Sequence, residues 1–171
     1  AINRLKKGLQ ETVCTGFTTN KNFLIAILEN EDFQQGKFDT HFLDKVFKYE
    51  GEKYPQETLD TLTCALIHYR FLQRQQERSV AQGVPAGWRN NAYQPQKETY
   101  SYHGFEFPIT YTSKGDALEI SFAEKSFTSI RHPELVSGSN NIVLEINGIR
   151  RNFFISQNGH QYFIQSAQLG Q

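Results

Sequence analysis

Methionine is absent from this chain of 171 residues, which also holds only two cysteines and one tryptophan. Cys14 and Cys64 are too few for a disulfide scaffold and fit a reducing compartment, where both are expected to be small buried side chains. The 18 basic and 18 acidic residues cancel, so no polycationic surface for nucleic acid or anionic lipid is expected. No apolar run approaches the ~18 residues of a membrane span, and the first residues lack the pattern of a secretion signal. The protein is therefore expected to be soluble and cytosolic or organellar.

What the chain does contain is enough apolar material for a core. Hydrophobic residues make up 38% and aromatic residues 13%, which exceeds what a disordered segment carries. The length suits one domain, or one domain and a piece of another. Because the sequence opens in a helical pattern and no initiator methionine is present, we expect a segment of a longer protein.

The first third has a helical pattern with breaks. Ile2, Leu5 and Leu9 recur at helical spacing, and Thr18–Asn20 caps a second helix with its own apolar stripe. This stretch is too short to cover both apolar faces with its own residues. It is therefore predicted to be the edge of a larger domain.

The middle of the chain predicts one long helix over residues 55–82, with Pro55 in its first turn and Gly83 at its stop. Apolar side chains occur on every face as far as Leu72, which is typical of a helix that is buried all round. The polar run Gln73–Arg78 is expected to protrude from the domain.

Residues 83–96 predict a linker, and from Lys97 onward the apolar period changes to two. Asn147-Gly148 and Asn158-Gly159 are strong two-residue hairpin signals, and the run Ser113 to Asp116 is a looser one. About six to eight antiparallel strands are expected over residues 97–168, and they need an apolar object to cover one face. The predicted fold is α+β: a long central helix enclosed by a curved or closed antiparallel barrel, preceded by a short helical segment.

The sequence offers no catalytic, cofactor-binding or metal-binding constellation. His68 lies among apolar residues of the long helix, where a hydrogen-bonded structural imidazole is expected. The other histidines are far apart in sequence, and no phosphate-binding loop or nucleophile motif occurs. What remains is the linker, whose Trp88, Arg89 and Tyr93 are candidate partner-binding residues because tryptophan, tyrosine and arginine often anchor interfaces. The alternative is that Trp88 plugs the open end of the sheet.

Several stretches of the first third occur in a specific order: a Gly-x-x-Thr-Asn motif, a helix, a short Phe/Gly turn and a Thr-x-Phe-Leu close. The residues are Ala1 to Leu5, Thr15 to Leu24, Asp32-Phe33, Gly36 and Phe38 to Leu43. This order resembles the C-terminal end of the biotin carboxylase domain of biotin-dependent carboxylases. The family's residues for ATP, Mg/Mn and carboxylation lie upstream of the matching stretch. Its biotinyl lysine lies downstream in a Met-Lys-Met motif, which a chain without methionine cannot contain.

The order of helix, loop and strands is similar to the mediating (BT) domain of acyl-CoA carboxylases such as propionyl-CoA and methylcrotonyl-CoA carboxylase. The resemblance implies residues 1–50 as the end of a biotin carboxylase domain and residues 51–171 as a mediating domain, with the helix, a hook-like loop over residues 83–96 and then the strands. It implies a parent enzyme of the ligase class that uses biotin, ATP and Mg/Mn, in a bacterial cytoplasm or in a mitochondrion.

The resulting functional prediction is a non-catalytic assembly segment. It would dock the biotin carboxylase and biotin carrier domains of its own chain onto a carboxyltransferase (beta) subunit or domain, for ATP-dependent carboxylation of an acyl-CoA. Neither nucleic acid nor a membrane is an expected partner. A small-molecule or lipid-binding barrel is the alternative, and a pyruvate or urea carboxylase parent is a third hypothesis that the helix-in-barrel order favours less.

Overall fold

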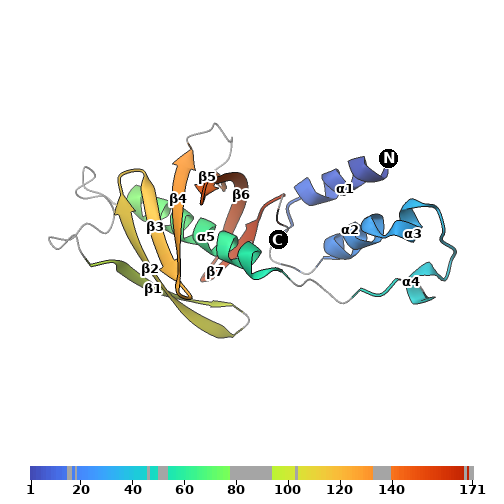
Figure 1. Cartoon of the computed structure of the whole chain (residues 1–171), viewed down its shortest axis with the longest axis horizontal. Coiled ribbons are helices and arrows are strands. Elements are labelled where there is room, and N and C mark those ends of the chain that lie inside the picture. Colours follow the sequence, from blue (N-terminus) through green and yellow to red (C-terminus); the bar gives the residue numbers. More distant parts are fainter. Residues whose placement is uncertain are drawn as a thin grey trace.

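The computed structural model describes residues 1–14, 17, 19–45, 47–49, 54–77, 94–102, 104–132, 140–167 and 169. Within these ranges the helices come first along the chain and the strands follow. Four helices gather at one end of the molecule, and a fifth lies against a curved sheet at the other (Figure 1).

The first four helices are α1 (Ile2–Glu11), α2 (Lys21–Glu29), α3 (Glu31–Gln34) and α4 (Phe42–Lys45). α3 starts at a cap, because the Asn30 side chain accepts a hydrogen bond from the Phe33 backbone N–H at 3.2 Å. Aromatic rings hold the turns between these helices together, with Phe33 stacked on Phe38 at 4.8 Å between ring centroids. Several apolar side chains nevertheless stay exposed, among them Leu5, Val13, Phe17, Phe38 and Leu43. Exposure of this extent agrees with the expected shortage of partners for these faces.

The long helix α5 (Gln56–Gln76) begins directly after Pro55, as the sequence predicts. The predicted residues 78–82 lie outside the described ranges. Its buried positions occur on all sides, and Cys64, Ala65 and Ile67 have no exposed surface. None of the helices in the described ranges combines the length and the hydropathy that a membrane span needs.

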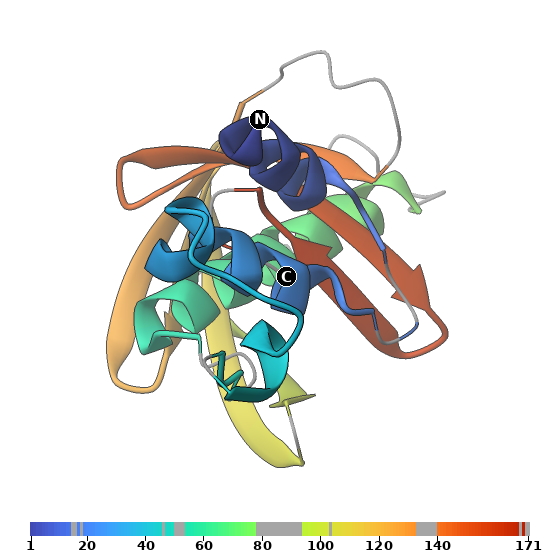
Figure 2. The same ribbon diagram turned by 90° about the vertical axis from the view of Figure 1, so that its right-hand side faces the viewer.

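The strands form one sheet of seven in the order β1 to β7, each antiparallel to its neighbours in the sequence. Their bounds are β1 (Gln96–Tyr102), β2 (Phe105–Lys114), β3 (Ala117–Phe122), β4 (Lys125–His132), β5 (Asn141–Ile146), β6 (Ile149–Asn158) and β7 (Gln161–Gln165). The predicted number and orientation of strands are therefore confirmed. The sheet curls into a half-barrel (Figure 2), and among the described residues β1 does not pair with β7.

The core lies between α5 and the curled sheet. α5 contacts β3 to β7, and its Leu62, Ile67 and Phe71 share one buried cluster with inward residues of the strands. Those strand residues are Ile109, Tyr111, Leu118, Ile120, Phe122, Ile142, Leu144, Ile146, Phe153 and Ile155. Period-two alternation thus does place one face of most strands against apolar side chains. The described strands leave the sheet open, so full enclosure of the helix stays a prediction.

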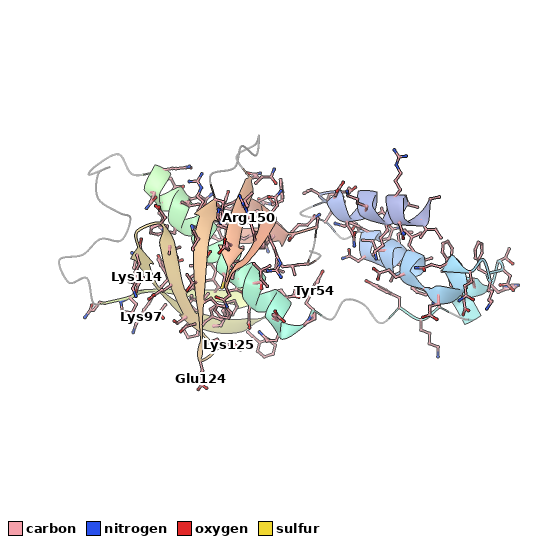
Figure 3. The ribbon with its side chains drawn as sticks, turned by 45° about the horizontal axis from the view of Figure 1, so that its top comes forward. Tyr54, Lys97, Lys114, Glu124, Lys125 and Arg150 are labelled. Atoms are coloured by element: carbon pink, nitrogen blue, oxygen red, sulfur yellow. The ribbon has the colours of Figure 1, made fainter. Side chains whose placement is uncertain are left out.

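An ion pair fastens the hairpin between β3 and β4 to the start of α5. The Lys125 ammonium lies 2.6 Å from Oδ2 of Asp60, whose side chain is only 3% exposed. Gln56 donates to the other carboxylate oxygen of Asp60 at 2.8 Å. Figure 3 shows Glu124 at the tip of the same hairpin, pointing away from the rest of the molecule. The buried carboxylate is therefore satisfied on both oxygens.

Two hairpin turns share a backbone shape but differ in sequence. Asn147 and Gly148 adopt φ values of 49° and 80°, whereas Ala123 and Glu124 adopt 48° and 61°. The Asn-Gly turn is the predicted one, because such turns favour residues that tolerate positive φ. The Ala-Glu turn carries no such signal and was missed. The predicted Asn158-Gly159 turn is shifted by one residue, since Asn158 ends β6 and pairs with Gln161.

Replacing Ala123→Asn together with Glu124→Gly is expected to raise the free energy of unfolding by about 1 kcal/mol, because an L-residue with a Cβ is disfavoured at positive φ by about 1–2 kcal/mol. Urea unfolding measures the change. The reverse pair, Asn147→Ala with Gly148→Glu, should destabilise, and by more, because Asn147 Oδ1 also accepts from the Thr128 N–H at 2.9 Å. A stabilisation by the reverse pair would contradict the assignment of both turns.

Candidate partner-docking site

The predicted partner-binding residues Trp88, Arg89 and Tyr93 all lie outside the described residues. The structure does describe the two points between which that segment runs: the end of α5 near Glu77 and the start of β1 at Gln96. The site is accordingly built from the side chains that hold these two points together.

A single carboxylate joins the last turns of α5 to the sheet. Glu98 on β1 forms an ion pair with Arg74 of α5, and Tyr100 donates a hydrogen bond to the same carboxylate. The Tyr111 hydroxyl on β2 lies 2.8 Å from Glu98 Oε1 and 2.7 Å from Gln96 Oε1. Both carboxylate oxygens therefore have partners, and the end of the helix is tied to the first two strands.

The charges of this cluster are set by burial and by hydrogen bonding together. Burial acts to raise the pKa of Glu98, but hydrogen bonds from Tyr100 and Tyr111 and the charge of Arg74 outweigh it, so the pKa lies below its usual value. Burial, and then the Glu98 carboxylate, raise the pKa of both tyrosines. At neutral pH the cluster is thus a carboxylate held by a guanidinium and two neutral phenols. It acts as a fixed anchor for the end of the helix.

A second group of contacts ties the same helix end to β7. The Arg70 guanidinium lies over the Tyr162 ring, 5.4 Å from its centroid, and Arg74 lies 5.5 Å from the centroid of Tyr111. Gln73 accepts from Arg70 at 3.2 Å and donates to the Tyr69 hydroxyl at 3.1 Å. The expectation that the whole polar run from Gln73 protrudes is therefore wrong for its first two residues. Only the side chains that follow are exposed as far as residue 77.

His68 is the one histidine that the sequence places in the core, and it is 2% exposed. Its Nδ1 lies 2.8 Å from Oγ of Ser129, which has no exposed surface. Burial, and then the charge of Arg131, lower the pKa of His68 to about 4. A serine hydrogen-bonded to a histidine can serve as a nucleophile, but here no substrate reaches the pair. The pair is structural, as the sequence predicts for His68.

Cys64 is equally inaccessible. Burial, and then the charge of Asp60, raise the pKa of its thiol well above the ordinary value, so it stays protonated in the fold. In the part of the chain that the structure describes, no three side chains among His, Cys, Asp and Glu come together as a metal site would require.

A surface cavity of about 450 Å³ lies between α1 and Ala167 and not inside the half-barrel. Its lining comes from Asn3, Lys6, Lys7, Gln10, Glu11 and Ala167. The Lys6 ammonium is engaged by Glu29 at 2.7 Å, and Lys7 lies 3.7 Å from Glu11. This cavity therefore carries paired charges on an exposed surface, whereas the concave side of the sheet is occupied by α5.

Comparison with known proteins identifies relatives of the N-terminal helices. Residues 1–45 match the family model of the biotin carboxylase C-terminal domain. A chloroplastic biotin carboxylase of Arabidopsis thaliana is 45% identical over 58 residues, which cover 33% of this chain and 10% of that protein. A pyruvate carboxylase subunit of Methanothermobacter thermautotrophicus is 44% identical over 45 residues, or 26% of this chain and 9% of its own. Biotin carboxylase 1 of Populus trichocarpa, also chloroplastic, is 44% identical over 45 residues, or 26% and 8%.

The similarity thus confirms the resemblance of the first third to biotin carboxylases. The chain spans about a tenth of the length of these curated relatives. The match ends near residue 45 in the family model and covers neither the sheet nor most of α5. The acyl-CoA specificity drawn from the helix and strand order receives no support or contradiction from these relatives.

Proposed function

We propose that the chain is an assembly segment of a biotin-dependent carboxylase, and that it belongs to the subunit that carries biotin carboxylase. The observation that carries the proposal is the sequence match over residues 1–45, followed in the same chain by a long buried helix and a seven-stranded half-barrel. An apolar helix packed on a curled antiparallel sheet fits the predicted mediating domain. In that domain the strands would enclose the helix.

The chemistry of such an enzyme explains why an assembly segment is useful. Biotin is carboxylated at one site with ATP and bicarbonate, and it then delivers the carboxyl group at a second site. Both sites must lie within reach of one tethered carrier, because a tether that cannot span the gap gives a near-zero effective concentration. A domain with a well-packed core that binds the carboxyltransferase would fix the distance between the two sites.

The docking element in this proposal is the segment between α5 and β1 that contains Trp88, Arg89 and Tyr93. Support comes from its two ends, which the cluster around Glu98 binds to one another. Anchoring both ends of a loop restricts its unbound conformations and so lowers the entropy that binding removes. We further propose an acyl-CoA as the final acceptor and a carboxyltransferase subunit or domain as the partner, in a bacterial cytoplasm or in a mitochondrion.

The ligand-binding alternative requires an empty space inside the sheet. Ile67, Ala65 and Cys64 of α5 have no exposed surface and pack in the cluster that also contains the inward strand residues. Since helix side chains take up this space, the observation favours the assembly segment over a lipid-binding barrel.

The test is co-purification of the parent subunit with its carboxyltransferase. Trp88→Ala with Arg89→Ala is expected to weaken the association at least tenfold, because tryptophan and arginine anchors commonly contribute about 2 kcal/mol or more each. Carboxylation of free biotin by the same variant should stay unchanged, because that reaction needs no docking.

A matched control removes an aromatic and a cationic side chain elsewhere. Phe105→Ala with Arg150→Ala changes exposed residues at the starts of β2 and β6. This control should co-purify as the wild type does. If the control loses its partner while the Trp88 variant keeps it, the docking surface is on the sheet and the assignment to the segment is wrong.

A further inference from the structure

The last residue of β7 reaches across the molecule to the end of the first helix. Gln165 is 3% exposed, and its Nε2 donates to two backbone carbonyls, those of Gln10 and Thr12, both at 3.0 Å. These carbonyls lie 155 and 153 residues earlier in the chain. The end of β7 and the end of α1 lie side by side in Figure 1, where the N-terminal helices meet the half-barrel.

The accepting carbonyls are at the C-terminal end of α1, where backbone oxygens lack partners inside the helix and carry the negative end of its dipole. Lys21, at the first position of α2 and only 6% exposed, donates from its ammonium to the same Thr12 carbonyl at 2.9 Å. Donors from two elements therefore converge on one helix end. Lys21 joins α1 to α2, and Gln165 joins α1 to the sheet.

The chemistry of Gln165 suggests that its donor group is the part that matters. Its Oε1 atom is buried and has no hydrogen-bond partner among the described residues. A buried acceptor without a partner carries a desolvation cost that an apolar side chain of the same shape would avoid. A glutamine at this position is therefore a poor choice for packing alone, while its amide N–H groups are both used.

We infer that Gln165 is a positioning residue that holds the N-terminal helices in one orientation relative to the half-barrel. The helices α1 to α3 pack on one another and α5 packs on the strands, so the two groups form separate clusters of contacts. Two hydrogen bonds from one side chain to successive turns of backbone fix a direction as well as a distance. In consequence, the orientation depends on a single side chain of β7.

The functional meaning of this orientation rests on the proposed function. If α1 to α4 belong to a biotin carboxylase domain, Gln165 sets the direction in which that domain leaves the docking segment. The carrier then meets two sites at a defined separation. Loss of the two hydrogen bonds would widen the range of separations and lower the effective concentration of the carrier at the second site.

The test is a distance measurement between spin labels on the two groups. The labels are placed at Lys7→Cys on α1 and Glu119→Cys on β3, both exposed, in a Cys14→Ser background that keeps the buried Cys64. Gln165→Met keeps the length and the volume of the side chain but removes its donors. The distance distribution is expected to be narrow in the parent of this variant and at least twofold broader in Gln165→Met.

The matched control is Gln157→Met, the same chemical change on β6. Gln157 is exposed and donates only to the nearby Gly159 carbonyl, at 2.8 Å. This control should keep the narrow distribution. Equal widths in the two methionine variants would overturn the inference, as would a broadening in Gln157→Met as large as that in Gln165→Met.

A second measurement needs no variant and stays decisive even if Gln165→Met fails to fold. The side-chain amide protons of Gln165 should exchange with water at least tenfold more slowly than those of Gln157, in proton exchange followed by NMR of the wild-type chain. Equal exchange rates would overturn the inference, because buried and bonded amide protons are protected from solvent.

In the parent enzyme, Gln165→Met should lower the coupled transfer of carboxyl to the final acceptor about fivefold and leave carboxylation of free biotin unchanged. A general loss of folding would lower both reactions. If the wild-type parent shows no biotin-dependent carboxylase activity, the proposed function fails, while the label distances and the amide exchange still decide the role of Gln165.

Discussion

Replacing Ile67→Ala is expected to lower the free energy of unfolding by about 3 kcal/mol, among the largest single effects in this chain. Ile67 has no exposed surface and lies in the cluster that α5 shares with the strands. The substitution removes three carbon atoms from a site that neighbouring strands cannot easily collapse into, so a cavity remains. Urea unfolding followed by circular dichroism measures the change.

The matched control is Ile149→Ala at the first position of β6, where the same side chain is 50% exposed. This change should cost less than about 0.5 kcal/mol, because surface substitutions away from special features are nearly neutral. If Ile67→Ala costs no more than Ile149→Ala, α5 is not part of the core. The space beside the sheet would then be open to a ligand, and the barrel that binds a small molecule or lipid would become the better hypothesis.

The parts of the fold that follow from local patterns were predictable from the sequence. Strand after strand alternates between apolar and polar residues, and Asn147-Gly148 fits a tight hairpin, so the meander of antiparallel strands follows directly. The long helix follows from apolar residues on all its faces and from Pro55 at its start. Curvature was predictable as well, because such a sheet must cover one face with something apolar.

The parts that depend on contacts between distant residues were not predictable. Arg74 looks like one more residue of a polar run, and only the fold brings it to Glu98. The turn at Ala123 and Glu124 is formed by the strands on either side, which impose positive φ on residues that rarely adopt it. Gln165 carries no signal at all in the sequence, since its partners are backbone carbonyls at the other end of the chain.

The candidate site shows the same division. Residue type alone singled out Trp88, Arg89 and Tyr93, and those residues lie outside the described part of the chain. The anchor around Glu98 was missed, because tyrosines alternating along a strand have the same pattern whether they face a carboxylate or an apolar core. The N-terminal resemblance succeeded for a different reason. It rests on the order of specific residues and not on physical periodicity, and it is the part that the family match confirms.

Acidification is expected to destabilise the fold through His68, by about 2 kcal/mol between pH 7 and pH 5 and by about 3 kcal/mol down to pH 4. The pKa of His68 is lowered from 6.5 to about 4 by burial and then by Arg131. Between these two values the unfolded chain binds a proton that the folded chain does not. The free energy of unfolding therefore falls as the pH falls through this window, and it is level above pH 7.

His68→Gln isolates this effect, because glutamine stays neutral and can still reach Ser129 with a hydrogen bond. The variant is expected to be less stable at pH 7 but to lose much less stability on acidification to pH 5. His160→Gln makes the same change at an exposed turn and should keep the wild-type pH dependence. The lowered pKa of Glu98 adds its own loss only at lower pH, as the carboxylate becomes protonated, so the interval from pH 7 to pH 5 separates the two groups. A wild-type slope in that interval no steeper than that of His68→Gln would show that the imidazole is not held neutral in the core, and the assignment of His68 and Ser129 as a structural pair would be wrong.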